Sequence, residues 1–234
     1  MALPKLNNIT YDLILPSTGE TLNFRPFLVK EQKALLIAQE SDDVKQIEKT
    51  FAQIITDCVI DDIDPYIMPM FDIEYVFLQL RGKSVGEKVT LSVLCPDDNE
   101  TRVDVEVDLD QVGIQQTKEH TNVIELAEDI NLVMRYPNLG DMQGFTGEGE
   151  IKSIFEMIKR CVHEIHEGET VHHRVDMSEK DLDAFIDSMS TTNFESVGNF
   201  FETMPKLVHV VEVKNPKTKK KSEIPIEGLQ SFFE

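Results

Sequence analysis

Apolar and polar residues alternate with a period of two near the N-terminus of the chain. Tyr11, Leu13 and Leu15 share one side of this alternation, a Pro-Ser-Thr-Gly stretch follows, and Leu22 and Phe24 resume the pattern. Alternation on both sides of turn-forming residues is typical of an antiparallel β-hairpin. We therefore expect a hairpin between residues 11 and 25.

Two later segments repeat this arrangement. Residues 89–95 and 103–109 flank a Pro-Asp-Asp-Asn turn, and residues 208–213 and 224–226 flank a turn that contains Asn215-Pro216-Lys217. Three proline-led hairpins fit a duplicated unit, although unrelated hairpins converge on the same pattern. In the middle hairpin one face is wholly anionic, because every alternate residue is acidic. These residues are Asp104, Glu106, Asp108 and Asp110.

Between the hairpins, apolar residues recur three and four positions apart, which predicts helices. The predicted helices cover residues 29–39, 44–58, 71–81, 123–135, 151–165, 178–189 and 194–204. Ser41 is expected to cap the second helix, Gly82 to end the third, and Ser178 to begin the sixth. The glycine-rich stretch 136–150 predicts a long surface loop.

The order hairpin, helices, hairpin, helices, hairpin predicts an α+β fold in which antiparallel hairpins alternate with amphipathic helices. The predicted loop suggests two lobes. We expect an N-terminal α+β lobe at 1–136, a loop at 137–150, and a C-terminal helical lobe with a closing hairpin at 151–234.

Composition and charge exclude several classes of function. The 234 residues include 23 Lys and Arg against 43 Asp and Glu, which gives a formal charge of -20. Such a chain lacks the basic face that nucleic acid or anionic lipid requires. No apolar run approaches the roughly 18 residues of a membrane span, and the first residues lack the apolar stretch of a signal peptide. We expect an intracellular protein with neither a nucleic-acid partner nor a membrane span.

The cysteines and one short motif carry no clear chemistry. Cys58, Cys95 and Cys161 are far apart in the sequence and form no CxxC pair, which fits a reducing compartment. Residues 81–84 read Arg-Gly-Lys-Ser, like the end of a phosphate-binding loop. That loop needs a glycine where this chain has Phe77, and a helix is predicted before it. A helix C-terminus with basic residues explains the motif.

A histidine-rich segment is the one candidate for metal chemistry. His163 and His166 would lie three residues apart on one face of the predicted helix 151–165, with Cys161, His172 and His173 nearby. A metal pair is geometrically possible there, but neither HExxH nor a second cysteine is present. No nucleophile motif occurs elsewhere. We expect a protein that is not an enzyme and has no cofactor, with a metal-dependent enzyme using residues 161–173 as an alternative.

Two surface features suggest contacts with other proteins. The last hairpin carries a cluster of lysines in an otherwise acidic chain, which would suit docking to a partner or to another copy of this chain. The cluster consists of Lys214, Lys217, Lys219, Lys220 and Lys221. Near the C-terminus, Phe232 and Phe233 either pack within the protein or provide an apolar anchor for a partner groove.

Six segments resemble the baseplate hub subunit family of T-even-like contractile-tailed bacteriophages. They are 11–19 (YDLILPSTG), 24–31 (FRPFLVKE), 71–75 (FDIEY), 80–87 (LRGKSVGE), 200–207 (FFETMPKL) and 227–233 (EGLQSFF). The segments span nearly the whole chain in the expected order. Relatives can carry a CPxC-like turn in the last hairpin, where this chain has Asn215-Pro216-Lys217-Thr218, so thiolate ligation of zinc is impossible at that turn.

The resemblance implies a non-enzymatic component of the baseplate hub, or a hub-assembly factor, that binds other tail proteins. It would act in the host cytoplasm during assembly and could remain in the virion baseplate, with homo-oligomers also possible. An alternative is a dedicated tail assembly chaperone that is absent from the mature virion. The partner-binding candidates are Arg25, Phe27, Lys30, Arg81, Lys83, Lys219, Lys220, Lys221, Phe232 and Phe233.

Overall fold

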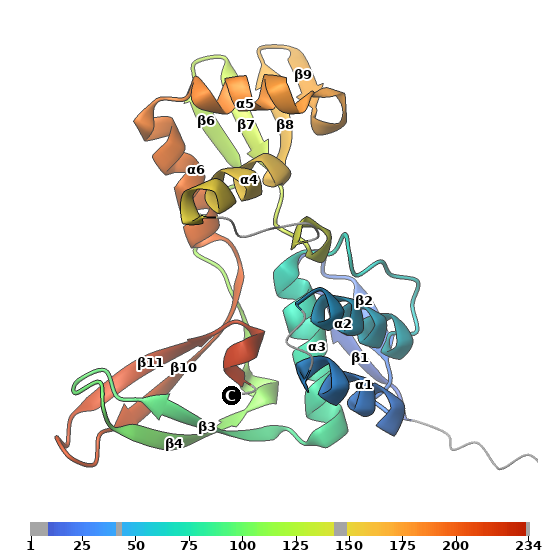
Figure 1. Ribbon diagram of the computed structural model, residues 1–234, viewed down its shortest axis with the longest axis vertical. Helices are drawn as coiled ribbons and strands as arrows, with labels where there is room; N and C mark the ends of the chain where they lie inside the picture. The colour runs from blue at the N-terminus through green and yellow to red at the C-terminus, as the bar shows by residue number, and fades with distance from the viewer. Residues whose placement is uncertain (1–8, 41–43, 143–148, 233–234) are drawn as a thin grey trace, which may run out of the picture. The chain divides into compact units, whose positions relative to one another are not determined.

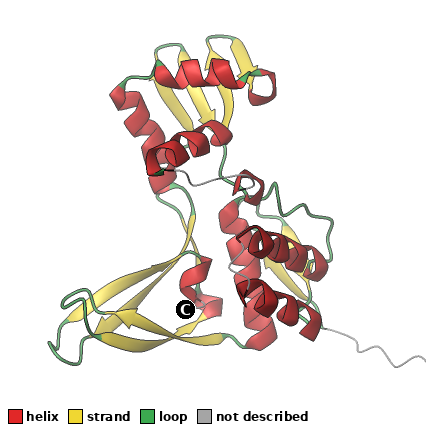
Figure 2. Ribbon diagram, viewed as in Figure 1, coloured by secondary structure: helices red, strands yellow, loops and turns green. Residues whose placement is uncertain are grey.

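The computed structural model describes residues 9–40, 44–142 and 149–232. The chain forms two compact units, of which the first comprises residues Met1–Gln115 and Lys206–Glu234 and the second Gln116–Pro205. Both units combine helices with small antiparallel sheets, so the α+β prediction is confirmed (Figure 2). The lobes expected from the sequence, 1–136 and 151–234, have different bounds from these two units. The last hairpin belongs to the first unit.

The first unit begins with the predicted hairpin and three helices (Figure 1). Its elements are β1 (Tyr11–Ile14), β2 (Thr21–Phe24), α1 (Val29–Glu40), α2 (Val44–Cys58) and α3 (Met70–Val85). The helices predicted at 29–39 and 44–58 are confirmed. Ser41, the expected cap of the second helix, lies outside the described residues.

Helix α3 is buried on almost every side, and the prediction that it ends at Gly82 is wrong. Gly82 lies inside the helix, where an added Cβ would meet the Leu109 Cβ at 3.8 Å, an ordinary contact. The helix ends at Val85, and Gly86 follows with a φ of 135°. The Gly86 N–H still donates to the Gly82 carbonyl over 3.2 Å. Only the later glycine has the positive φ that favours a stop.

Two β-hairpins pack their apolar faces into the same core as α3. The first consists of β3 (Lys88–Leu94) and β4 (Arg102–Asp108). The second, β10 (Lys206–Lys214) and β11 (Lys221–Glu227), is extended by β5 (Gly113–Gln115) in the order β11-β10-β5. Short 3₁₀ helices follow at Leu109–Gln111 and Leu229–Phe232. Both predicted hairpins are confirmed, and their alternate residues supply the buried side chains Leu91, Val107, Val211, Val213 and Ile226.

The three proline-led turns of this unit share one hydrogen bond and one positive φ. In each, the N–H of the fifth residue donates to the carbonyl of the first, and that fifth residue has a positive φ. The pairs are Gly19 to Leu15 (2.8 Å, φ 74°), Asn99 to Cys95 (3.0 Å, φ 52°) and Lys219 to Asn215 (2.9 Å, φ 65°). The similarity therefore extends to the first five residues of each turn. The middle turn is one residue longer, because the Cys95 N–H donates to the Thr101 carbonyl, whereas the Leu15 and Asn215 N–H groups donate to the sixth residue of their turns.

The second unit is a four-stranded antiparallel sheet with three helices (Figure 1). Its strands are β6 (Val123–Ala127), β7 (Ile130–Met134), β8 (Val162–Glu167) and β9 (Thr170–His173), in that order across the sheet. Its helices are α4 (Glu150–Cys161), α5 (Glu179–Asp187) and α6 (Thr191–Thr203), with 3₁₀ turns at Leu139–Met142 and Arg174–Asp176.

Two helix predictions in this unit are wrong. Residues 123–135 form the hairpin β6–β7 instead of a helix, and the helix predicted at 151–165 stops at Cys161. From Val162 onward the chain forms β8 and pairs with β7, so tertiary pairing overrides the helical spacing of the apolar residues. Of the predicted loop 136–150, part forms a 3₁₀ turn and residues 143–148 lie outside the described range.

The helices predicted at 178–189 and 194–204 are confirmed as α5 and α6. The Ser178 hydroxyl accepts the Asp181 N–H over 3.2 Å, which is the expected N-cap. The apolar faces of these helices join one side of the sheet in a separate core. Its buried members include Ile124, Leu132, Ile158, Cys161, Leu182, Val197 and Phe200.

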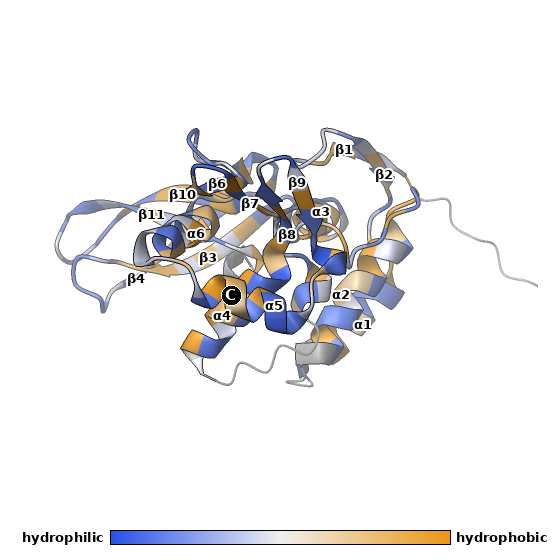
Figure 3. Cartoon of the chain, turned by 90° about the horizontal axis from the view of Figure 1, so that it is seen from above, coloured by the Kyte–Doolittle hydropathy of each residue, from blue (hydrophilic) through white to orange (hydrophobic). Residues whose placement is uncertain are grey.

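The helices carry both hydrophilic and hydrophobic residues along their length (Figure 3). Within the described ranges, no helix is both long enough and apolar enough to cross a bilayer.

The three cysteine thiols are buried and free, which predicts low reactivity in the folded protein. Burial raises the pKa of Cys58 to about 11 and that of Cys161 to about 12. Because the thiolate is the reactive form, we expect the native thiols to react with Ellman's reagent at pH 8 on the order of 10²-fold more slowly than in urea. Absorbance measures the rates. Rapid native reaction of Cys161 would show that the core of the second unit opens locally.

Candidate protein-binding surfaces

Arg25 and Lys30, two of the candidate residues, lie where the β2 strand leads into α1. Arg25 Nη2 is 2.7 Å from Glu31 Oε1 and donates to the Asp57 carbonyl at the same distance. Glu31 Oε2 accepts the Leu28 N–H over 2.8 Å, as in a capping box, and its side chain is only 2% exposed. Lys30 Nζ lies 3.1 Å from both Glu31 and Asp57. These contacts join the hairpin to α1 and α2.

Phe27 is half-buried against the same helix layer. Its ring centroid lies 5.5 Å from that of Phe77, and its backbone N–H donates to Ser84 Oγ over 2.7 Å. Ser84 in turn bonds to the Leu80 carbonyl within α3. The aromatic contact fixes the chain before α1 against the middle of α3, and the hydrogen bond fixes it against the C-terminal end.

Arg81 and Lys83 project from α3 itself. Lys83 Nζ pairs with Glu87 at 2.6 Å and Asp110 at 2.9 Å, and it lies 5.9 Å from the centroid of the Tyr11 ring. Arg81 is half-buried, and burial lowers the pKa of its guanidinium. The Arg-Gly-Lys-Ser stretch therefore belongs to a packed helix and has no phosphate-loop conformation. Its charged groups already have partners within the chain.

The lysine cluster surrounds the turn between β10 and β11, and we call it the lysine tip (Lys214, Lys217, Lys219, Lys220 and Lys221). All five residues are exposed. Lys221 pairs with Glu212 at 2.5 Å and Lys217 approaches Glu100 at 3.8 Å. Within the described residues, Lys214, Lys219 and Lys220 have no ion-pair partner.

The lysine tip is held by contacts with the turn between β3 and β4. Asn215 is 1% exposed, and its Nδ2 donates to Asp97 Oδ1 over 2.9 Å. The Thr218 hydroxyl donates to the other Asp97 oxygen, while Asn215 Oδ1 accepts the Lys217 N–H over 2.8 Å. Hydrogen bonds from Thr218 and Asn215 lower the pKa of Asp97. The Asp97 carboxylate thus points to the β10–β11 turn and holds it, while the lysines of that turn remain exposed.

The acidic face predicted on the middle hairpin is present on β4. Asp104 and Glu106 are exposed, and Asp108 is half-buried. Asp110, the fourth predicted member, lies beyond the strand in the 3₁₀ helix Leu109–Gln111 and pairs with Lys83. Lys88 on the neighbouring strand pairs with Glu106 at 2.6 Å. The strand therefore presents a partly neutralised anionic row.

The C-terminal aromatic residues are described only in part. Leu229 is buried, and its N–H donates to Glu74 Oε1 on α3 over 3.3 Å, so the final 3₁₀ turn begins against the core. Phe232 is the last residue of that turn, and Phe233 lies outside the described range.

The histidine cluster lies on the β8–β9 hairpin, so the expected helical pairing of His163 and His166 is wrong. His166 Nε2 is 2.8 Å from Glu164, and His173 Nδ1 is 3.1 Å from the same carboxylate. Hydrogen bonding to His166 lowers the pKa of Glu164. Among the described residues, no three His, Cys, Asp or Glu side chains are arranged to hold a metal ion. The helical spacing of His163 and His166, on which the metal-dependent alternative was based, is therefore not present.

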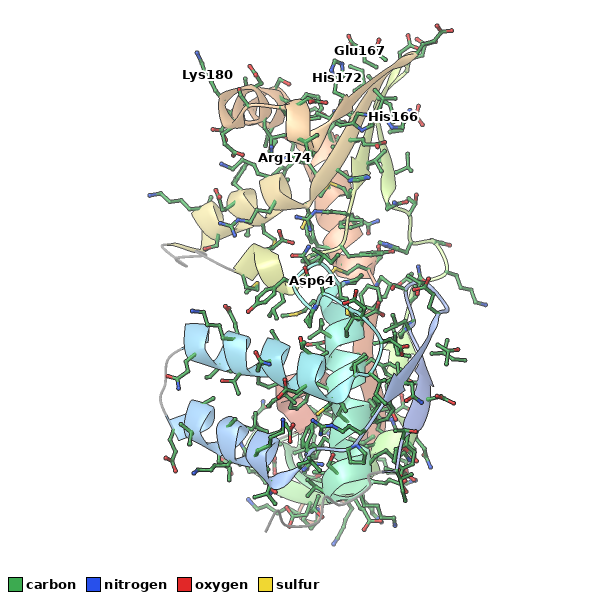
Figure 4. All side chains as sticks on the ribbon, turned by 90° about the vertical axis from the view of Figure 1, so that its right-hand side faces the viewer. Asp64, His166, Glu167, His172, Arg174 and Lys180 are labelled. Carbon is green, nitrogen blue, oxygen red and sulfur yellow. The ribbon has the colours of Figure 1, made fainter. Side chains whose placement is uncertain are left out.

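A cavity of about 420 Å³, which the sequence did not predict, opens beside β9. Its apolar walls come from Ile130, Ile165, Met177, Leu182 and Phe185, and its polar residues are Glu167, His172, Asp176 and Asp181. Figure 4 shows Glu167 and His172 near the end of the β8–β9 hairpin. The lining residues come from three strands, a 3₁₀ turn and a helix, so no short motif could have indicated the cavity.

The two units thus define a small α+β protein with charged and apolar surfaces suited to contacts with other proteins. Residues 7–234 match the family described as T4 bacteriophage base plate protein, and the chain belongs to this family. It is a structural protein of the phage tail baseplate. No curated protein and no solved structure matched the chain.

The Arg25–Glu31 pair yields a prediction about stability. Burial raises the pKa of Glu31, but hydrogen bonds from Arg25, Lys30 and the Leu28 N–H outweigh burial and lower it overall. We expect Glu31→Gln to reduce the free energy of unfolding at pH 7 by about 1–3 kcal/mol, because Arg25 loses its charged partner.

The effect should depend on pH in one direction. A carboxylate with a lowered pKa stabilises the fold above its unfolded pKa of about 4.3, and this stabilisation is lost as pH falls through the folded pKa. The difference between wild type and Glu31→Gln should therefore shrink below about pH 4. Urea unfolding at several pH values measures it, with the exposed Glu40→Gln as the matched control. An equal loss in both variants would contradict the assigned role.

Proposed function

We propose that this baseplate protein is a component of the baseplate hub, or a factor that assembles the hub, and that it acts by binding other tail proteins. It would act without catalysis and without nucleic acid, first in the host cytoplasm and then in the virion. The observation that carries this proposal is the lysine tip, an exposed and structurally fixed cationic loop on a chain of net charge -20.

The charges around the lysine tip favour a protein partner with an acidic surface. Three of its lysines have no ion pair within the described chain, whereas the Asp97 carboxylate accepts hydrogen bonds from Asn215 and Thr218. Charges at the rim of an interface speed association and set orientation more than they add affinity. A loop held by a buried asparagine also loses little conformational freedom on binding. The docking would therefore be selective and sensitive to salt.

The other candidate residues take a different place in this proposal. Arg25, Phe27 and Lys83 already have partners within the first unit, so we assign them to the framework that supports α3. We assign Lys30, which pairs with Asp57, and Arg81, which lies on α3, to the same framework. Phe232 and Phe233 remain candidates for an apolar anchor.

A dedicated assembly chaperone, absent from the finished virion, is the second candidate. The strong negative charge favours it, because like charge keeps complexes of a holding protein apart. Both candidates share the binding surface and differ in whether the protein stays in the particle.

Quantitative mass spectrometry of purified virions and of infected-cell lysate distinguishes the two candidates. For a hub component we expect an amount in virions that is stoichiometric with other baseplate proteins. Abundance in lysate with absence from particles would instead establish the assembly chaperone. Absence from both, in a cell that produces virions, would contradict both candidates.

Reversing two charges of the lysine tip tests the binding surface. We expect Lys219→Glu with Lys220→Glu to weaken association with tail proteins by at least about tenfold, because like charges would then oppose each other. Binding is measured by pull-down of tail proteins from infected cells and by rescue of particle yield. Lys33→Glu with Lys118→Glu is the control with the same charge change at other exposed lysines. Equal loss of binding in both double variants, or no loss in either, would contradict the assignment of the lysine tip as a binding surface. Thermal melting shows whether each variant folds.

A further inference from the structure

Strand β9 forms one edge of the sheet in the second unit. The sheet order is β6-β7-β8-β9, and all four β9 residues are exposed. Along its outer side, no backbone hydrogen bond to another described segment is present. An uncovered edge of this kind can accept an additional strand from another protein.

The cavity beside β9 lies on one definite face of the sheet. Ile165 pairs with His172 and Ile130 pairs with Glu167, so these four side chains share the face that carries the helices. The far wall consists of Met177 and residues of α5. Side chains of an added strand would alternate between faces, so every second one would point towards this cavity.

The polar residues of the cavity are mainly acidic. Asp176 has no ion-pair partner in the described part of the chain, and Asp181 accepts the Ser178 hydroxyl over 2.6 Å. Glu167 lies 3.3 Å from His172. The nearby cations do not neutralise these carboxylates. Arg174 pairs with Glu179, and Figure 4 shows Lys180 extending away from Glu167 and His172.

An exposed apolar residue adds to the same surface. Val175 is 90% exposed between Arg174 and Asp176, in the 3₁₀ turn that connects β9 to α5. An apolar cavity with acidic polar residues complements an apolar side chain that is flanked by cations.

We propose that β9 and this cavity bind an extended segment of a partner protein. The segment would add to the sheet edge, insert one leucine-like side chain into the cavity, and place Lys or Arg two positions away on either side. Residues two positions apart lie on the same face of a strand, so the cations would meet Glu167, Asp176 and Asp181. This inference rests on the proposed binding function and names the chemistry of a second partner.

The probe is a terminally blocked peptide of the sequence Thr-Lys-Thr-Leu-Thr-Lys-Thr. It is titrated to about 1 mM into the full-length protein and followed by backbone amide chemical shifts. We expect saturable binding, with the shifts confined to β9, the 3₁₀ turn at Arg174–Asp176 and α5. Replacing the central leucine by serine, or both lysines by glutamate, should weaken binding at least tenfold.

Two protein variants test the edge and the charge separately. The two-residue loop Gly168–Glu169 makes Glu167 and Thr170 the closing pair of the hairpin, so Val171 in the next pair is expected to direct its N–H outward. Val171→Pro should then block strand addition and leave β8–β9 pairing intact. Asp176→Lys should weaken the lysine peptide at least tenfold. Glu195→Lys, the same change at an exposed position on α6, is the control.

Several outcomes would overturn this proposal. They are the absence of saturable binding, equal binding of the serine peptide, or equal loss in Asp176→Lys and Glu195→Lys. Concentration-dependent self-association that Val171→Pro abolishes would assign the edge to a second copy of this chain instead of a partner. Sedimentation velocity detects that case, and circular dichroism confirms that each variant folds.

Failure of this site can be distinguished from failure of the proposed function. Reversal of Lys219 and Lys220 should change peptide binding by less than about twofold, because those residues belong to the other unit. If the peptide does not bind while the protein is found in virions, only the second site is wrong. If the protein is absent from both virions and lysate, the proposed function fails whatever the peptide does.

Discussion

Burial of α3 on nearly all sides is the constraint on which the first unit depends. Ile73, Val76, Phe77 and Leu80 lie on one side of the helix, Phe71 and Leu78 lie on the opposite side, and all are buried. One layer of α1 and α2 cannot cover such a helix, because a helix that is apolar all round requires neighbours on every side. The remaining cover comes from distant parts of the chain. This explains why residues 206–234 return to the first 115 residues and why the second unit is an insertion between them.

The same constraint positions the lysine tip. Strand β10 pairs with β5 at Leu207–Ile114, and its buried residues join the core around α3. The hairpin β10–β11 keeps its apolar face in that core as far as Val213, and its turn is held by Asn215 and Asp97. A buried, fully hydrogen-bonded asparagine fixes a loop more firmly than surface ion pairs do. The exposed lysines are therefore presented by a rigid scaffold, although the loop itself is polar.

The sequence predicted those elements whose pattern is local. The three hairpins, α1, α2, α5 and α6 have clear periods and clear turn or cap residues, and all were confirmed. The prediction of a helix at 123–135 was wrong because two short strands joined by a tight turn can imitate helical spacing. The prediction that the next helix continues to residue 165 was wrong because the pairing of β8 with β7 cannot be read from the residues of β8 alone. The acidic cavity depends on the same pairing, and so it could not be predicted either.

The two surfaces carry opposite chemistry on separate units, and this has a consequence for assembly. The lysine tip suits an acidic partner, whereas the cavity beside β9 suits an apolar side chain flanked by cations. A protein that only kept one client soluble would need one such surface. Under the two proposals above, each surface would prefer a different partner and reject the other through like-charge repulsion. Such selectivity is what a connecting subunit of a baseplate requires, and it favours the structural role over the chaperone.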